Sequence, residues 1–136
     1  MSHMTLEYSG NLQADGRFDE LCRKLARYMC DLRVDDEPVF PPGGVRVRAL
    51  LCNDYCIADG SLRNAGFVHA ILKIGAGRSG ATQQMVCNGL FEIIKAHFGP
   101  PQREEGLALS LEFTEFSESG TLKDNNLHEM LKNAVR

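Results

Sequence analysis

Three features that mark whole classes of protein are missing from this sequence. No apolar run approaches the roughly 18 residues of a membrane-spanning helix. The first residues, Met1 to Met4, show neither the charged lead nor the apolar stretch of a signal peptide, so we expect a cytoplasmic protein without membrane contacts. There is no basic excess, because 15 Lys and Arg stand against 18 Asp and Glu, a net charge of −3. This balance argues against nucleic-acid binding.

The cysteines also lack the patterns of a disulfide framework or a zinc site. There are five, an odd number, at irregular spacing and without a Cys-x-x-Cys pair. The histidines do not complete a zinc-like spacing around Cys52 and Cys56. We therefore predict reduced thiols that mostly fill the core, and no metal site.

What is present is the composition of one globular domain. With 136 residues, of which 43% are apolar and 24% charged, the chain has room for one sizeable core, and we expect a single domain over residues 1–136. Alternating apolar residues predict strands at 4–9, 45–51, 67–74 and 107–114. Three- and four-residue spacing predicts two long helices, one at 18–32 capped by Asp15 and one at 80–98 capped by Ser79.

The order of these elements is β-α-β followed by β-α-β, which predicts an α+β fold. A helix between two strands usually forms a right-handed parallel crossover. Two such units side by side make a four-stranded mixed sheet with both helices on one face. The other face then stays open, which predicts oligomerisation. Residues 35–44 are expected to form a loop, and residues 123–132 one or two helical turns.

A glycine-rich turn, residues 75–80, matches the Gly-x-Gly-x-x-Gly pattern between a strand and a helix. A dinucleotide site also needs a further strand with an acidic residue about 20 positions on, and that region is the end of a helix here. Two other interpretations stay open. Arg78 and the helix N-terminus bind a carboxylate, or the segment is an ordinary turn with a solvated arginine.

Four segments occur in order at consistent separations: Met1–Ser9, Phe67–His69, Leu72–Ser79 and Lys123–His128. Together they resemble the 5-carboxymethyl-2-hydroxymuconate isomerases, a branch of the tautomerase superfamily. The Lys-Ile-Gly-Ala-Gly-Arg-Ser run and the Lys-x-Asn-Asn-x-His tail are the most specific parts. The resemblance extends from Met1 to Lys132, and residues 33–38 are extra relative to the family.

The resemblance implies a homotrimer of β-α-β-β-α-β subunits, with the sheets inside and the active sites near subunit boundaries. It implies a metal- and cofactor-independent isomerase of unsaturated 2-hydroxy polycarboxylic acids, such as 5-carboxymethyl-2-hydroxymuconate, in the degradation of aromatic compounds. The family base is the amine of an N-terminal proline, exposed when the initiator Met is removed. At the matching positions, Arg46 and Arg78 are expected to bind substrate carboxylates and to stabilise the developing enolate.

Position 2 is Ser rather than Pro, and three explanations are open. Removal of Met1 exposes the primary amine of Ser2, whose ordinary pKa of about 8 leaves roughly a tenth of it neutral at pH 7. Nearby arginines would lower that pKa and increase the neutral fraction. Alternatively, Ser-His-Met is the remnant of a cloning tag. In the third case the protein is a non-catalytic or weakly active trimeric carboxylate-binding homologue.

The histidines invite a general-base role, but other interpretations are simpler. His97 lies near a helix C-terminus, where a cation is favoured, and we expect it to be structural. His69 alternates with core positions on a strand, so we expect a partly buried histidine with its hydrogen bonds satisfied. His128 belongs to the tail motif without an assigned role, and Glu7 is expected to be a solvated strand residue.

Overall fold

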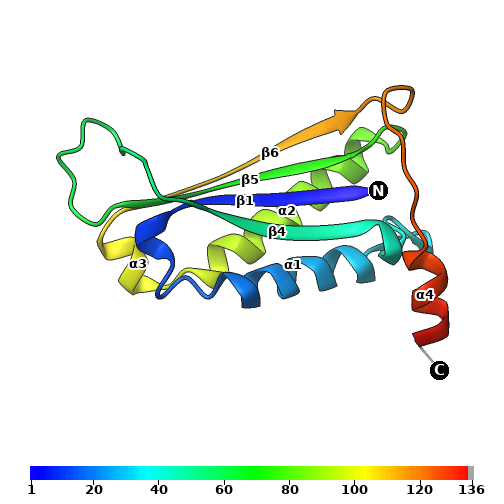
Figure 1. The fold of residues 1–136 in the computed structure, drawn as a ribbon, viewed down its shortest axis with the longest axis horizontal. Helices are drawn as coiled ribbons and strands as arrows, with labels where there is room; N and C mark the ends of the chain where they lie inside the picture. The colour runs from blue at the N-terminus through cyan, green and yellow to red at the C-terminus, as the bar shows by residue number, and fades with distance from the viewer. Residues whose placement is uncertain (135–136) are drawn as a thin grey trace.

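The computed structural model of the chain describes residues 1–134. Its main sheet has the strand order β4-β1-β5-β6 (Figure 1). The strands are β1 Ser2–Ser9, β4 Val45–Cys52, β5 Gly66–Gly75 and β6 Leu107–Phe116. β1 is parallel to β4 and β5 is parallel to β6, while the central pair β1–β5 is antiparallel. The α+β class, the two parallel units and the mixed sheet are therefore confirmed.

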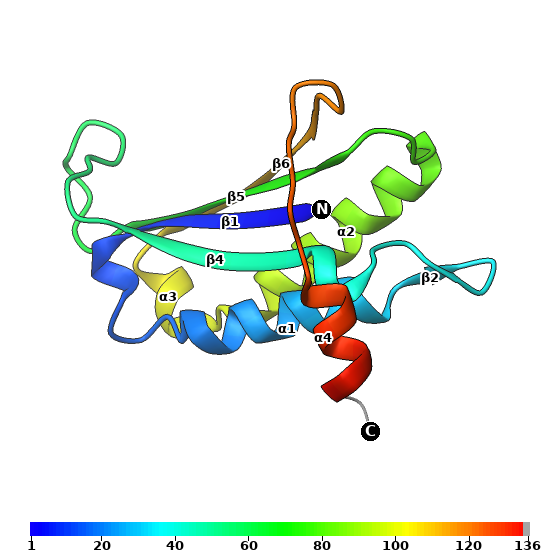
Figure 2. The same cartoon turned by 45° about the vertical axis from the view of Figure 1, so that its right-hand side comes forward.

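Two long helices, α1 (Phe18–Asp31) and α2 (Gly80–His97), cover one face of the sheet (Figures 1 and 2). Each buries one apolar stripe at helical spacing. The stripes consist of Phe18, Leu21, Leu25 and Met29 on α1, and Val86, Leu90 and Ile94 on α2. They pack against the alternate residues of β1 and β5 that point to the same side. No helix in the described residues is long and apolar enough to cross a membrane.

The opposite face of the sheet carries no helix within residues 1–134, as the element order predicted (Figure 1). It presents the other alternate residues, among them His3 on β1, Arg46 on β4 and His69 on β5, since the residues between them are those in the core. Leu50 on β4 is 47% exposed there. A large apolar side chain on an open sheet face is a feature that a partner surface can cover.

The segment between α1 and β4 is more ordered than the predicted loop. β2 (Arg33–Val34) and β3 (Glu37–Pro38) form a two-stranded hairpin, and a 3-10 helix η2 (Pro42–Gly44) leads into β4. Asp35 and Asp36 both have positive φ, 53° and 65°, which is the geometry of the two central residues of a type I′ turn.

The two predicted helix caps have different outcomes. Ser79 caps α2, because its Oγ accepts a hydrogen bond from the Thr82 amide at 3.1 Å. The Asp15 prediction is wrong: Arg17 is the N-cap of α1, with a φ of 49° and no side-chain cap hydrogen bond. A hydrogen bond from His97 to the carbonyl of Gly16, at 2.7 Å, fixes this segment instead.

Two short helices complete the described chain. Proline fits the first turn of a helix, because its missing N–H has no partner there, so α2 is followed by a new helix, α3 (Pro100–Glu104). The predicted helical turns in the tail are confirmed as α4 (Leu127–Ala134), which extends away from one end of the sheet in Figure 2.

The thiols are free, as expected, but they do not fill the core. Cys56 is exposed and the other four are half-buried. Met85 on α2 is likewise 39% exposed. The buried stripe of each helix is narrow, so the neighbours of its members, such as Cys22 beside Leu21, stay at its edge.

Candidate functional site

The N-terminus of the chain is fixed at one end of the sheet. β1 begins at Ser2, which is paired with Val45 of β4 and Ile74 of β5. The main chain of Met1 lies against Gly44, where an added Cβ would come within 3.3 Å of the Met1 Cα. Only glycine allows this approach without a shift of the neighbouring backbone. The terminal amine is therefore positioned at the strand end (N in Figure 1).

A cavity of about 480 Å³ opens beside this terminus. Its walls are Met1, Arg46 and part of the segment after β6, namely Leu122, Lys123, Asp124, Asn125 and His128. The Nη1 atom of Arg46 is buried and has no hydrogen-bond partner within residues 1–134. A buried charged donor without a partner is costly, and a carboxylate is the ligand whose geometry fits a guanidinium. The cavity therefore suits an organic anion.

The amine of Met1 is less basic than a free terminal amine. Burial lowers its pKa from the ordinary 8.0, and the positive charges of Lys123, Arg78 and Arg46 lower it further, while Glu118 opposes them. Among the described residues, none of these three cations forms an ion pair. A lowered pKa leaves more of the amine neutral near pH 7, which is the state that a general base requires.

Arg78 lies at the same end of the sheet but does not line this cavity. Its Nε and Nη2 donate to the carbonyl of Val39 at 3.2 and 2.9 Å, and its Nη1 donates to that of Gly75 at 3.1 Å. The guanidinium lies 4.9 Å from the centre of the Phe40 ring, and burial lowers its pKa. The structure thus places Arg46 on the cavity, whereas Arg78 is bound to the backbone outside it.

Ser2 does not offer its side chain to the cavity. The residue is 1% exposed and shares a face of β1 with the core residues Met4 and Leu6. Its Oγ has no hydrogen-bond partner in the described part of the chain, so no base is in place to activate it as a nucleophile. The chemistry that residue 2 offers is that of its main-chain nitrogen, which becomes an amine once Met1 is removed.

The tail motif forms the outer wall of the cavity. Asn125 donates from Nδ2 to the carbonyl of Gly43 at 2.9 Å, and its Oδ1 accepts from the Leu127 amide at 2.7 Å where α4 begins. His128 lies directly on Gly43, because an added Cβ there would come within 2.8 Å of the His128 amide nitrogen. Asparagine before an apolar run is a sequence signal for a helix start. Nothing local in the sequence indicates that this start docks on Gly43.

His97 is structural, as predicted, but it is not the cation expected at a helix end. It is 3% exposed, its Nε2 donates to the Gly16 carbonyl at 2.7 Å, and its Nδ1 faces the Lys24 ammonium at 3.1 Å. Burial lowers its pKa, and the charges of Lys24 and Arg17 lower it further. A neutral imidazole with its proton on Nε2 explains both contacts, because Nε2 donates to the Gly16 carbonyl and Nδ1 accepts from the Lys24 ammonium.

His69 has its hydrogen bonds satisfied, also as predicted. Its Nδ1 lies 2.6 Å from the Ser110 Oγ, and its Nε2 lies 3.0 Å from a carboxylate oxygen of Glu112. Glu7 stands opposite His69 in the β1–β5 register, half-buried on the open face. These residues lie outside the cavity at the N-terminus.

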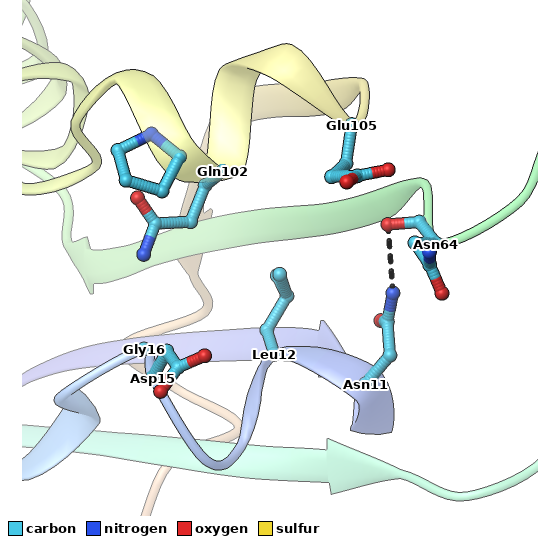
Figure 3. A pocket seen from close by; sticks show the side chains of 8 residues that line it. Asn11, Leu12, Asp15, Gly16, Asn64, Gln102 and Glu105 are labelled. Carbon is cyan, nitrogen blue, oxygen red and sulfur yellow. Dashed lines mark hydrogen bonds between the residues drawn. The ribbon is translucent and has the colours of Figure 1, made fainter.

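A second cavity, of about 210 Å³, lies at the opposite end of the sheet (Figure 3). It is lined by Asn11, Leu12, Asp15, Gly16, Asn64, Pro101, Gln102 and Glu105. Two of these residues are carboxylates and none is a cation. Asn11 also donates to the Asn64 carbonyl at 3.1 Å, as the dashed line in Figure 3 marks. The two carboxylates repel an anion, so this cavity is not an anion site.

The fold and this site define a class of protein. Two β-α-β units that form one mixed sheet, with both helices on one face and the chain terminus beside arginines at the strand end, make up the tautomerase-like fold. A family model described as 5-carboxymethyl-2-hydroxymuconate isomerase matches residues 2–131. The chain belongs to the 5-carboxymethyl-2-hydroxymuconate isomerase family, which confirms the resemblance, and it is an isomerase by that membership.

Individual relatives agree with this assignment. The 5-carboxymethyl-2-hydroxymuconate Delta-isomerase of Escherichia coli is 34% identical over 132 residues, which are 97% of this chain and 100% of the relative. A 5-carboxymethyl-2-hydroxymuconate isomerase from Deinococcus radiodurans R1 is 40% identical, with a TM-score of 0.85 over 96% of this chain and 93% of that one. A crystal structure of a 5-carboxymethyl-2-hydroxymuconate delta-isomerase has 33% identity, a TM-score of 0.87 and the same coverage.

Proposed function

We propose that this protein isomerises 5-carboxymethyl-2-hydroxymuconate, or a closely similar unsaturated 2-hydroxy polycarboxylate, with its N-terminal amine as the base. One observation carries the proposal. Met1 and Arg46 line the same cavity, so a carboxylate bound by Arg46 brings the rest of the substrate next to the amine. After removal of Met1, the reacting group is the amine of Ser2.

The reaction is an internal proton transfer. The neutral amine takes the proton of the 2-hydroxyl group, and the electron pair left on oxygen spreads over the conjugated chain as a dienolate. The resulting ammonium returns a proton to carbon at the far end of the diene, so that a ketone forms and the overall composition is unchanged. Arg46 stabilises the added negative charge, which is larger in the dienolate than in the substrate.

Arg78 has a double role in this proposal. A guanidinium has five N–H donors, and the contacts to Val39 and Gly75 engage only its Nε and one hydrogen on each terminal nitrogen. The remaining two donors are available for a second carboxylate. Its charge also lowers the pKa of the terminal amine.

A homotrimer completes the site in this proposal. The open sheet face carries Leu50, which is 47% exposed, together with charged residues such as Arg48. Apolar surface of this kind is stabilised when it is covered. Assembly through these faces would bring the open side of each N-terminal cavity next to a neighbouring subunit.

The test is a ketonisation assay on the wild-type protein, with the intact mass measured to show whether Met1 is absent. Cyanate at near-neutral pH carbamoylates the α-amine ahead of lysine, because their ordinary pKa values differ by roughly 2.5 units. We expect this to reduce turnover about 100-fold or more, the usual contribution of a general base. Turnover that survives complete carbamoylation would exclude the amine as the base.

The presence of Ser2 in place of proline favours one second candidate, a carboxylate-binding protein with little or no catalysis. The Ser2→Pro variant separates the two. The isomerase gains turnover when the family's amine is restored, whereas the binding protein gains none and retains carboxylate affinity through Arg46.

A further inference from the structure

We infer that Lys123 is a specificity-determining residue that binds the carboxymethyl carboxylate of the substrate, an inference that rests on the proposed function. The family substrate is a muconate, which has two terminal carboxylates, with a third on its carboxymethyl branch. Arg46 and Arg78 are assigned to the first two. Lys123 lines the cavity together with Arg46, whereas Arg78 lies outside it, so Lys123 is the further fixed positive charge on the described cavity wall.

Lys123 lies close to where the chemistry is placed. It lines the cavity together with Met1 and Arg46. Of all charged side chains, Lys123 lowers the pKa of the Met1 amine most, ahead of Arg78 and Arg46. A carboxylate that reaches Lys123 is therefore within the same small volume as the amine.

The segment that carries Lys123 is anchored on both sides. Before it, Gly120 donates its amide to the Ser117 Oγ at 3.1 Å, which closes a turn directly after β6. After it, Asn125 donates to the carbonyl of Gly43 at 2.9 Å. Lys123 is held over the cavity between these two points, and its side chain is exposed and thus accessible to a ligand.

Lys123 has no structural task that would account for it. Within residues 1–134 it takes part in no side-chain hydrogen bond and no ion pair, although Asp124 lines the same cavity and Glu118 acts on the same amine. The lysines with structural partners are elsewhere, for example Lys24 beside His97 and Lys95 beside Glu92. A cation kept free on a cavity wall is available for an anion.

The test compares two substrates, 5-carboxymethyl-2-hydroxymuconate and 2-hydroxymuconate, which has the same diene without the third carboxylate. For Lys123→Met we expect kcat/KM to fall about five-fold with the first substrate and to stay within about two-fold with the second, since one exposed charge pair is lost. Lys123→Arg should restore most of the preference. Lys132→Met is the matched control, because Lys132 is on α4 and does not line this cavity.

The rates must be taken on the pH plateau of each variant. Loss of the Lys123 charge raises the pKa of the amine, because one positive charge beside it is removed. The acid limb of the pH–rate profile therefore moves to higher pH with both substrates alike. The other titratable or charged groups that line the cavity or act on the amine are Arg46, Arg78, Asp124, Glu118 and His128.

An equal loss of kcat/KM with both substrates, or no loss with either, would overturn the inference. If the wild type turns over neither substrate, the proposed function fails. Calorimetry with propane-1,2,3-tricarboxylate against glutarate then decides about Lys123: the inference stands only if Lys123→Met weakens the tricarboxylate selectively.

Discussion

At the end of the sheet where β1 finishes, two arginines are held by protein partners. Arg17 donates to a carboxylate oxygen of Glu20 at 3.0 Å and to the carbonyl of His97 at 2.7 Å. Arg103 donates to the carbonyls of Lys95 and Phe98. At the end where β1 begins, Arg46 has a buried nitrogen without a partner, and Lys123 forms no ion pair in the described residues.

The difference separates cations bound by the protein, which include Arg78 at the end where β1 begins, from cations without a protein partner. A buried donor with a carbonyl or carboxylate partner recovers its desolvation cost within the protein, whereas one without a partner lowers stability until an anion binds. Among residues 1–134, the buried guanidinium nitrogen without a partner is at the end where β1 begins. Substitutions at the end where β1 begins should therefore reduce activity more than stability, and substitutions at the other end should reduce stability more than activity.

The largest effect is expected for Arg46→Ala. Loss of a preorganised donor to the developing charge should reduce kcat/KM by about 100- to 1,000-fold. The melting temperature should stay the same or rise slightly, because the variant removes a buried nitrogen that lacks a partner. Steady-state kinetics and thermal unfolding on the same preparations measure both quantities.

Arg23→Ala is the control for this variant. Arg23 lies on α1 in an exposed pair with Asp19 at 3.2 Å, a kind of pair that contributes little, so both activity and melting temperature should stay near the wild type. If Arg46→Ala unfolds the protein while retaining turnover per folded molecule, Arg46 belongs with the stabilising cations and the contrast between the two ends is lost.

A smaller effect is expected for Gly43→Ala, which tests whether the tail shapes the cavity. The added Cβ would come within 2.9 Å of main-chain atoms of His128, so the start of α4 must move and carry the cavity wall with it. We expect kcat/KM to fall about ten-fold, chiefly through KM, since a displacement of about 1 Å in a positioning group is costly.

Gly80→Ala is the matched control, because a Cβ at Gly80 meets nothing within 4 Å. It lies at the start of α2, near the same end of the sheet. Full activity in Gly43→Ala would show that the position of α4 does not matter for substrate binding. The functional part of the cavity would then be the wall that Arg46 forms on β4.

The sequence predicted the fold well because the fold depends on local periodicity. Alternation gave the four strands, and the helical spacing of residues such as Leu21 and Leu25 gave the buried stripe of α1. The prediction was wrong where a long-range contact decides the structure. α1 begins at Phe18, as predicted, but its N-cap is Arg17 and not Asp15, although Asp15 is a good cap by type. His97, at the C-terminal end of α2, holds the carbonyl of Gly16 in this segment.

The site was predicted only as far as the family resemblance reached. Arg46 and Arg78 were named from matching positions, whereas the tail that includes Lys123 had no assigned role. Its place on the cavity depends on the hydrogen bond between Asn125 and Gly43, two residues far apart in the chain. Such a pairing has no periodicity that a single sequence displays.

The smallest effect on activity is expected for His97→Gln at the opposite end. The variant loses one buried hydrogen bond, to Gly16 or from Lys24, and should be less stable by about 1 kcal/mol. Turnover per folded molecule should stay within about two-fold of the wild type, because the change in stability is uncoupled from the transition state. Urea unfolding at pH 7.5 and kinetics on the same samples check both values.

The pH dependence of that loss identifies the charge state of His97. Burial lowers the pKa of His97 in the folded protein below its ordinary 6.5. As the pH falls, the unfolded chain therefore binds the proton at a higher pH than the folded protein does. The stability that neutral His97 contributes is complete above pH 6.5 and is lost as the pH falls through the folded pKa. Glutamine does not titrate, so the gap in unfolding free energy between wild type and His97→Gln should narrow from pH 7.5 to pH 5. A gap that is constant or widens toward pH 5 would mean that His97 is already a cation in the fold, and that Lys24 and Arg17 face a like charge rather than an acceptor.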